Sequence, residues 1–214
     1  MIEWFVSNRE SLKLIYGIFV ALICFFIVIR TDKLFRLSLH QGIRYFRNAF
    51  LFFGLGFILR YIVGTSYIFS KFLFEFFLIM GGFFLFYSLI WKKFESPKKE
   101  TRSSLFNLRI IIFYILTIVL VALDYFWKTY YFMFFSQIIL FLLIVLISYF
   151  NYLNKKGKFL KFYFISVLMI FIAWILNLLA ALIFNWDPLI ILIVYLLNII
   201  IFILFFIGIL RFTS

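Results

Sequence analysis

The chain has 214 residues, of which 67% are hydrophobic and 25% aromatic, and its formal net charge is +13. This composition excludes an ordinary soluble domain, in which about half of the residues are apolar. Apolar runs long enough to cross a bilayer as helices recur along the whole length. The sequence therefore predicts an all-α, multi-pass integral membrane protein.

The apolar runs predict a bundle of seven transmembrane helices in a single domain, residues 1–214. The predicted spans cover about 12–30, 44–64, 70–91, 108–127, 131–150, 162–184 and 188–210. Polar connections separate them, among them a Gly-Thr-Ser hinge at 64–66 and a charged segment around Pro97. Because most connections are short, sequential helices are expected to pack as antiparallel neighbours.

Lysine and arginine are distributed unevenly between the two ends of the predicted spans. They concentrate in the connections after spans one, three and five and at Arg211, whereas bases and acids balance on the other side. Cytoplasmic loops of membrane proteins carry an excess of Lys and Arg. We therefore expect an external N-terminus and a cytoplasmic C-terminus in the cell membrane. This orientation accounts for the positive charge without a nucleic-acid partner.

A run of basic residues follows the first predicted span. Lys33, Arg36, His40, Arg44 and Arg47 are three or four residues apart, a spacing that places them on one face of a helix. We expect an interfacial helix here that leads into the second span and binds anionic lipid headgroups at the cytoplasmic face. The alternative is a docking face for an acidic cytoplasmic partner.

Seven side chains inside the predicted spans are unusual for membrane helices. They are Arg60, Glu75, Asp124, Gln137, Trp174, Asn177 and Asn198. Ionisable residues inside a membrane are energetically expensive, so they are candidates for function. Arg60, Glu75 and Asp124 fall at similar depths near the outer ends of three sequential spans. The sequence thus predicts an outward-facing ligand pocket lined by these seven residues.

The same charges allow a structural interpretation. Lys71 precedes Glu75 by four residues, and Asp124 precedes Lys128 by four, so each acid has a base within reach on its own helix. For Asp124 we expect the pair with Lys128. For Arg60 and Glu75 we expect a direct pair between adjacent helices, which either only staples the helical hairpin or also forms one wall of a binding site.

The sequence contains no recognisable catalytic constellation. With one histidine, His40, and one cysteine, Cys24, the chain cannot supply the usual zinc ligand sets or a bis-His haem. It has no glycine-rich phosphate loop and no pair of acids on one span. We therefore expect a non-enzymatic protein without a cofactor, and the alternative is a lipid-modifying enzyme that uses Arg60, Glu75 and Asp124.

The number and orientation of the spans resemble those of seven-helix receptors and retinal proteins, although the last span lacks the lysine that a retinal Schiff base needs. Size and topology are also similar to those of the small seven-helix sugar transporters and the KDEL receptor family, which are built as three plus one plus three helices. Arg60 and Tyr61 resemble an Arg-Tyr pair of the latter, but the Pro-Gln motif of that superfamily is missing. Such resemblance speaks to the fold alone.

Three functions stay open at this point. The leading hypothesis is a sensor or receptor-like module with an outward polar pocket and a basic cytoplasmic face, which would work with a cytoplasmic or membrane protein partner. The second is a transporter of a small solute or lipid. The third is a structural subunit of a membrane complex, in which the polar residues serve assembly.

Overall fold

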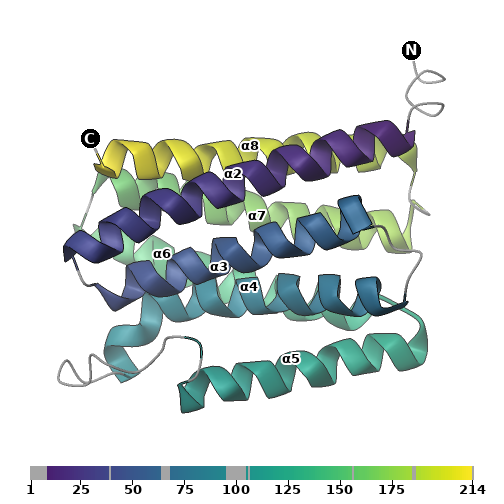
Figure 1. Cartoon of the computed structure of the whole chain (residues 1–214), viewed down its shortest axis with the longest axis horizontal. Helices are drawn as coiled ribbons and strands as arrows, with labels where there is room; N and C mark the ends of the chain where they lie inside the picture. The colour runs from purple at the N-terminus through teal and green to yellow at the C-terminus, as the bar shows by residue number, and fades with distance from the viewer. Residues whose placement is uncertain are drawn as a thin grey trace.

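A computed structural model describes residues 9–38, 40–63, 68–94, 105, 107–155, 157–184 and 187–213. In these ranges the chain forms long α-helices that run side by side, one short π-helix and no strand (Figure 1). The elements are α2 (Arg9–Ser38), α3 (Gln41–Ile58), η1 (Leu59–Val63), α4 (Ile68–Phe94), α5 (Leu108–Trp127), α6 (Tyr131–Lys155), α7 (Lys158–Leu182) and α8 (Pro188–Thr213). The predicted all-helical class is confirmed, while the Gly-Thr-Ser hinge and most of the segment around Pro97 lie outside the described residues.

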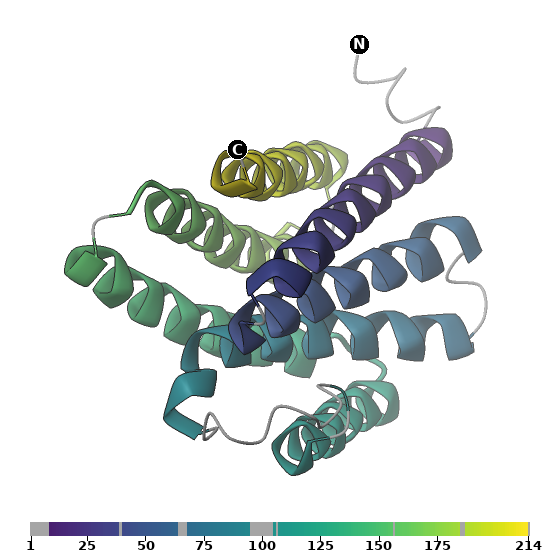
Figure 2. The same ribbon diagram turned by 60° about the vertical axis from the view of Figure 1, so that its left-hand side comes forward.

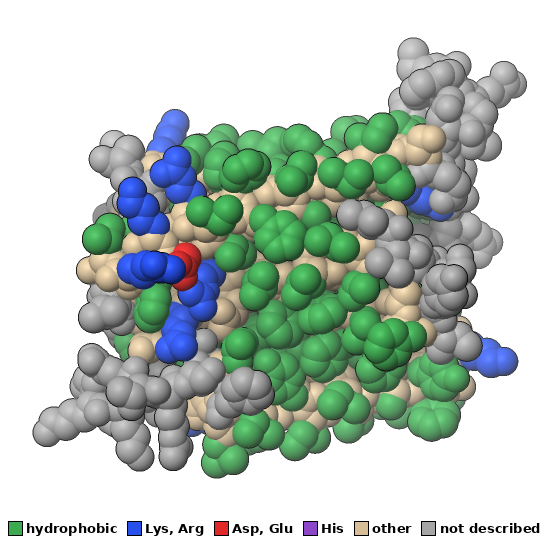
Figure 3. Space-filling model, viewed as in Figure 1, with side chains coloured by type: hydrophobic (Ala, Val, Ile, Leu, Met, Phe, Trp, Pro, Cys, Tyr) green, Lys and Arg blue, Asp and Glu red, His purple; other side chains and the backbone are tan. Residues whose placement is uncertain are grey.

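Six of the described helices are long and apolar enough to cross a membrane, namely α2 and α4 to α8. Their outward surfaces carry large apolar side chains that are well exposed, such as Ile112, Phe126 and Phe150 (Figure 3). A soluble protein rarely exposes apolar surface so extensively, whereas lipid favours it. The helices therefore support a multi-pass membrane protein.

The helix α3 is the exception to this apolar pattern. It begins with Gln41 and carries Arg44, Arg47 and Asn48 in its first half, yet eleven of its residues are buried. Phe50 and Phe53 pack edge-on against Phe202 of α8. Most of this helix packs against protein, so less of its surface has to be apolar than in the other helices.

The helices form a ring with one helix outside it. Within one group α2, α3 and α4 pack in sequence, and within the other α6, α7 and α8 do the same. The ring closes because α2 meets α8 and α4 meets α6. The remaining helix, α5, packs on α4 and α6 from outside (Figure 2). Two groups of three helices thus enclose a common interior.

The predicted interfacial helix across residues 32–47 is wrong. The first helix continues unbroken to Ser38, and α3 begins at Gln41, so the basic run is divided between two helices. Polar residues can extend α2 because their side chains bond within the helix. The Thr31 hydroxyl donates to the carbonyl of Ile27 at 2.6 Å, and Asp32 accepts from Arg36 one turn later at 2.9 Å.

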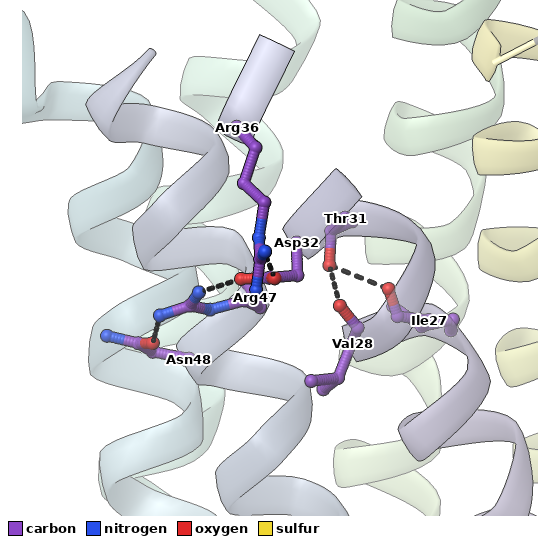
Figure 4. Close-up of polar contacts among 7 residues, drawn as sticks. All are labelled: Ile27, Val28, Thr31, Asp32, Arg36, Arg47 and Asn48. Atoms are coloured by element: carbon purple, nitrogen blue, oxygen red, sulfur yellow. Dashed lines mark hydrogen bonds and ion pairs between the residues drawn. The ribbon is translucent and has the colours of Figure 1, made fainter. Parts of the chain in front are cut away.

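The carboxylate of Asp32 joins α2 to α3 at this turn. One of its oxygens pairs with Arg36 and the other with Arg47 of α3 (Figure 4). Arg47 also donates to Asn48, and Arg44 lies over the ring of Phe35. Lysine and arginine side chains gather on one surface of the molecule (Figure 3), and the predicted basic residues come from both helices of this hairpin, not from one helical face.

The pairing of Arg47 with Asp32 is expected to stabilise the hairpin. Their side chains are 24% and 28% exposed, whereas Arg36, on the same acid, is 80% exposed. We expect Arg47→Met to lower the free energy of unfolding by about 1 kcal/mol and the matched Arg36→Met to change it little. Thermal unfolding of the purified protein in detergent measures both, and an equal loss in the two variants would contradict the assignment.

Candidate ligand-binding cavity

A cavity of about 340 Å³ lies inside the ring of helices. Side chains from α2, α3, η1, α4, α6, α7 and α8 line it, and none of the described lining residues comes from α5. The volume lies at the lower end of the range for pockets that hold small molecules. The two three-helix groups thus enclose a space of useful size.

Four of the seven residues expected to form a pocket line this cavity: Arg60, Trp174, Asn177 and Asn198. The other three, Glu75, Asp124 and Gln137, are almost completely buried but are absent from its described lining. The structure therefore brings together two of the three amides, the tryptophan and the cation of the predicted set, and it places both acids and Gln137 elsewhere.

Tyrosines form much of one wall, which the sequence reasoning missed. The rings of Tyr16 and Tyr195 are stacked with centroids 4.3 Å apart, and Tyr61 meets Tyr16 edge-on at 5.2 Å. Asn198 donates from Nδ2 to the Tyr16 hydroxyl at 3.0 Å. A tyrosine inside an apolar span carries a hydroxyl that needs a partner, and this was the available signal.

A glycine allows this wall to close. Gly17 of α2 faces Tyr61 of η1, and a Cβ at Gly17 would overlap the Tyr61 side chain. The absence of a side chain thus lets the two backbones approach, as small residues commonly do between membrane helices. Gly17 is therefore needed for the position of Tyr61 in the cavity wall.

The expected pair between Arg60 and Glu75 is not formed. The guanidinium of Arg60 instead lies 4.5 Å from the ring centroid of Phe74 and 5.8 Å from that of Tyr61. No ion pair found among the described residues includes Arg60. Arg60 and Glu75 therefore lie on neighbouring elements without being partners.

Lys71 is the close partner of Glu75. Its ammonium lies 3.7 Å from Glu75 Oε1 and also donates to the carbonyl of Thr129 at 3.3 Å. The same ammonium sits 4.0 Å from the ring centroid of Tyr130. Lys71 therefore connects α4 with the turn between α5 and α6, and the predicted structural pair within α4 is present.

Asp124 has a structural role, but the predicted partner is wrong. Its carboxylate accepts the backbone N–H groups of Phe132 at 3.0 Å and Met133 at 2.7 Å, and the Thr129 hydroxyl at 3.0 Å. Phe132 and Met133 belong to the first turn of α6, whose N–H groups have no partner within that helix. Asp124 therefore caps α6 from the end of α5, and Lys128 turns the chain in the left-handed region with φ 54°.

Of the remaining predicted residues, Asn177 and Trp174 have partners inside the bundle, whereas the amide of Gln137 has no hydrogen-bond partner among the described residues. Asn177 donates from Nδ2 to the carbonyl of Ala173 at 2.8 Å, on the same helix. Trp174 packs edge-on against Phe134 with centroids 6.0 Å apart. Gln137 packs against Gly82 of α4, and neither of its polar atoms has a hydrogen-bond partner among the described residues.

Comparisons with known proteins assign no family. No family model matches the chain, and no solved structure matches it. An uncharacterised protein of Archaeoglobus fulgidus is 41% identical over 49 residues, which cover 23% of this chain and 22% of that protein. Because the similarity is limited to this short stretch, the function has to be argued from the cavity itself.

The capping role of Asp124 predicts a large loss of stability on its removal. We expect Asp124→Ala to lower the free energy of unfolding by about 2–3 kcal/mol, because it leaves buried N–H groups of α6 unpaired. Lys128→Gly is the control: it removes the positive charge but suits the left-handed backbone, so no loss is expected. A substantial loss of unfolding free energy in Lys128→Gly would instead indicate that Asp124 does pair with Lys128.

A double-mutant cycle separates the two cations near Glu75. We expect Glu75→Gln and Lys71→Gln to couple by about 1 kcal/mol in unfolding free energy, because their charges lie within ion-pair distance. Glu75→Gln and Arg60→Gln should couple more weakly. A stronger coupling with Arg60, measured by unfolding in detergent, would revive the cross-helix pair.

Proposed function

We propose that the protein is a receptor-like membrane module that binds a small molecule in its central cavity. The observation that carries this proposal is the combination of an internal cavity with a cation, Arg60, and two amides, Asn177 and Asn198, on its wall. Pockets of small-molecule binding proteins are typically apolar with few polar groups that fix orientation. The described lining suits binding more than catalysis.

The position of the cavity supports access from outside the cell. Lys13 near the start of α2, Tyr130 just before α6 and Ile191 near the start of α8 all line it. These residues lie at the end of the bundle away from the α2–α3 turn with its basic residues, in the helix directions of Figure 1. If the basic end is cytoplasmic, as the positive-inside rule requires, the cavity faces outward.

In this proposal a signal leaves at the cytoplasmic end. The basic surface around Asp32 offers Arg36 and Arg44 to anionic headgroups or to an acidic partner protein. Two of the helices that line the cavity, α2 and α3, meet in this turn. A ligand that shifts these helices would thus alter the surface presented to a partner.

A transporter is the second candidate, and the ring itself favours it. Contacts between α2 and α8 on one side and between α4 and α6 on the other relate the two three-helix groups by the same pattern. Transporters commonly place a substrate between two repeated helical groups that rock against each other. The receptor and transporter proposals differ in whether the cavity opens to one side or to both.

Cysteine labelling tests the access to the cavity. We expect Asn177→Cys, in a chain with Cys24→Ala, to react with a membrane-impermeant thiosulfonate added outside sealed proteoliposomes, because Asn177 lines the cavity. Ile172→Cys is the control on the same helix, since Ile172 is 44% exposed on the lipid side. Labelling from outside alone supports the receptor, labelling from either side supports the transporter, and labelling from neither side leaves only a structural subunit.

A further inference from the structure

We infer that the cavity takes an anionic ligand with an apolar body, whose acidic group pairs with the guanidinium of Arg60. The inference rests on the proposed function, because it needs a cavity that a ligand can enter. The shared chemistry is a carboxylate or phosphate on a ring system or short acyl chain. Three features of the described residues lead to it.

The first feature is the sorting of charges around the cavity. Arg60 lines it, while no described lining residue is an acid. The nearby acids are used elsewhere: Glu75 lies against Lys71, and Asp124 caps the first turn of α6. A site lined by one sign of charge with low-dielectric walls attracts ligands of the opposite sign.

The second feature is the state of the Arg60 guanidinium. Aromatic rings of Phe74 and Tyr61 lie near it, and no hydrogen bond or ion pair to Arg60 is found among the described residues. A guanidinium has five N–H donors in its plane, in a fork that matches a carboxylate or phosphate. A cation–π contact uses the charge but leaves these donors available, so an anion satisfies them.

The third feature is the aromatic wall, which by itself would suit a cation equally well. Tyr16, Tyr195 and Trp174 present rings to the cavity, and cages of such rings bind quaternary ammonium groups. Repulsion from Arg60 opposes such a ligand. The rings therefore fit the body of the ligand, where stacking contributes, and the amides of Asn177 and Asn198 are placed to contact a further polar group.

Charged labelling reagents test the sign of the cavity without knowledge of the ligand. Two thiosulfonate reagents are compared, one that transfers a negatively charged sulfonate group (the sulfonate reagent) and one that transfers a positively charged ammonium group (the ammonium reagent). Each rate of reaction with Asn177→Cys, in the Cys24→Ala background, is divided by the rate of the same reagent with free cysteine. We expect this normalised rate to be about tenfold higher for the sulfonate reagent. Arg60→Gln should remove most of this preference and Arg60→Lys should retain it. Lys33→Gln removes a cation near the end of α2 that lies away from the cavity, so it should leave the preference for the sulfonate reagent unchanged.

The outcomes of this test are distinct. If neither reagent labels Asn177→Cys but both label Lys128→Cys in the same background, the cavity is closed and the proposed function fails. If both label Asn177→Cys at equal normalised rates, or the ammonium reagent is faster, the function stands and the anionic ligand is overturned. If Arg60→Gln unfolds in detergent, Arg60→Lys still tests the inference. This variant keeps the positive charge, so it must retain the preference for the sulfonate reagent that the parent shows.

A matched set of small probes tests the body and the charge together. Phenylbutyrate, phenylbutanol and phenylbutylamine share one ring and chain and differ in charge. We expect phenylbutyrate to raise the melting temperature of the protein most and phenylbutylamine to raise it least. In Arg60→Gln, phenylbutyrate and phenylbutanol should raise the melting temperature by the same amount. Equal shifts for all three in the parent protein, or a larger shift for the amine, would overturn the inference.

Lipid nanodiscs separate the two sources of such an anion. If phosphatidylglycerol slows the sulfonate reagent relative to pure phosphatidylcholine, and does so only with Arg60 present, the acidic group belongs to a membrane lipid. If it has no effect while phenylbutyrate still protects the thiol of Asn177→Cys, the group belongs to a soluble ligand. Either result supports the anionic site, and protection by phenylbutylamine alone contradicts it.

Discussion

The structure depends on one constraint: an apolar surrounding cannot satisfy backbone N–H and C=O groups, so the chain has to do so itself. Helices meet this demand along their length and leave it open at their ends. The buried carboxylate of Asp124 fulfils it for the first turn of α6, across the turn from α5. Hydroxyls and amides inside the bundle follow the same logic, as Ser166 donates to Phe162 and Asn177 to Ala173 of their own helices.

This constraint also explains how the charges are distributed. An acid can be paired by backbone N–H groups, which every helix start provides, whereas an arginine needs carbonyl, carboxylate or aromatic partners. Asp124 is therefore buried in a structural role, and Glu75 is held beside Lys71. Arg60 retains a position on the cavity wall against Phe74. Backbone N–H groups thus pair with Asp124 and a lysine lies beside Glu75, which leaves Arg60 as the charged residue of the predicted set on the cavity wall.

Sequence patterns were sufficient for the bounds of most helices and insufficient for the direction in which their polar side chains point. Apolar length placed the described spans to within a few residues except at the first turn, where α2 continues to Ser38. Depth placed Arg60 and Glu75 side by side, but successive helical residues point about 100° apart. Phe74 faces Arg60, so its neighbour Glu75 cannot. The stacking of Tyr16 on Tyr195 was not predicted for the same reason. Packing decides which face of α2 meets α8, and the sequence pattern does not show it.

The end of α3 shows how packing fixes that direction for the residue that matters most to the cavity. Here the helix widens into the π turn η1, which carries both Arg60 and Tyr61. Turns of this kind break the regular carbonyl ladder and are frequent at functional sites. Ser70 of α4 donates to the carbonyl of Leu59 at 3.2 Å, and Phe74, one turn further along α4, covers the Arg60 guanidinium. One helix thus both supports the irregular turn and orients its cation. Phe53 and Phe57 of α3 line the cavity, and Arg60 and Tyr61 of η1 continue this wall. A π turn is wider than an α turn, so one more residue faces the same side.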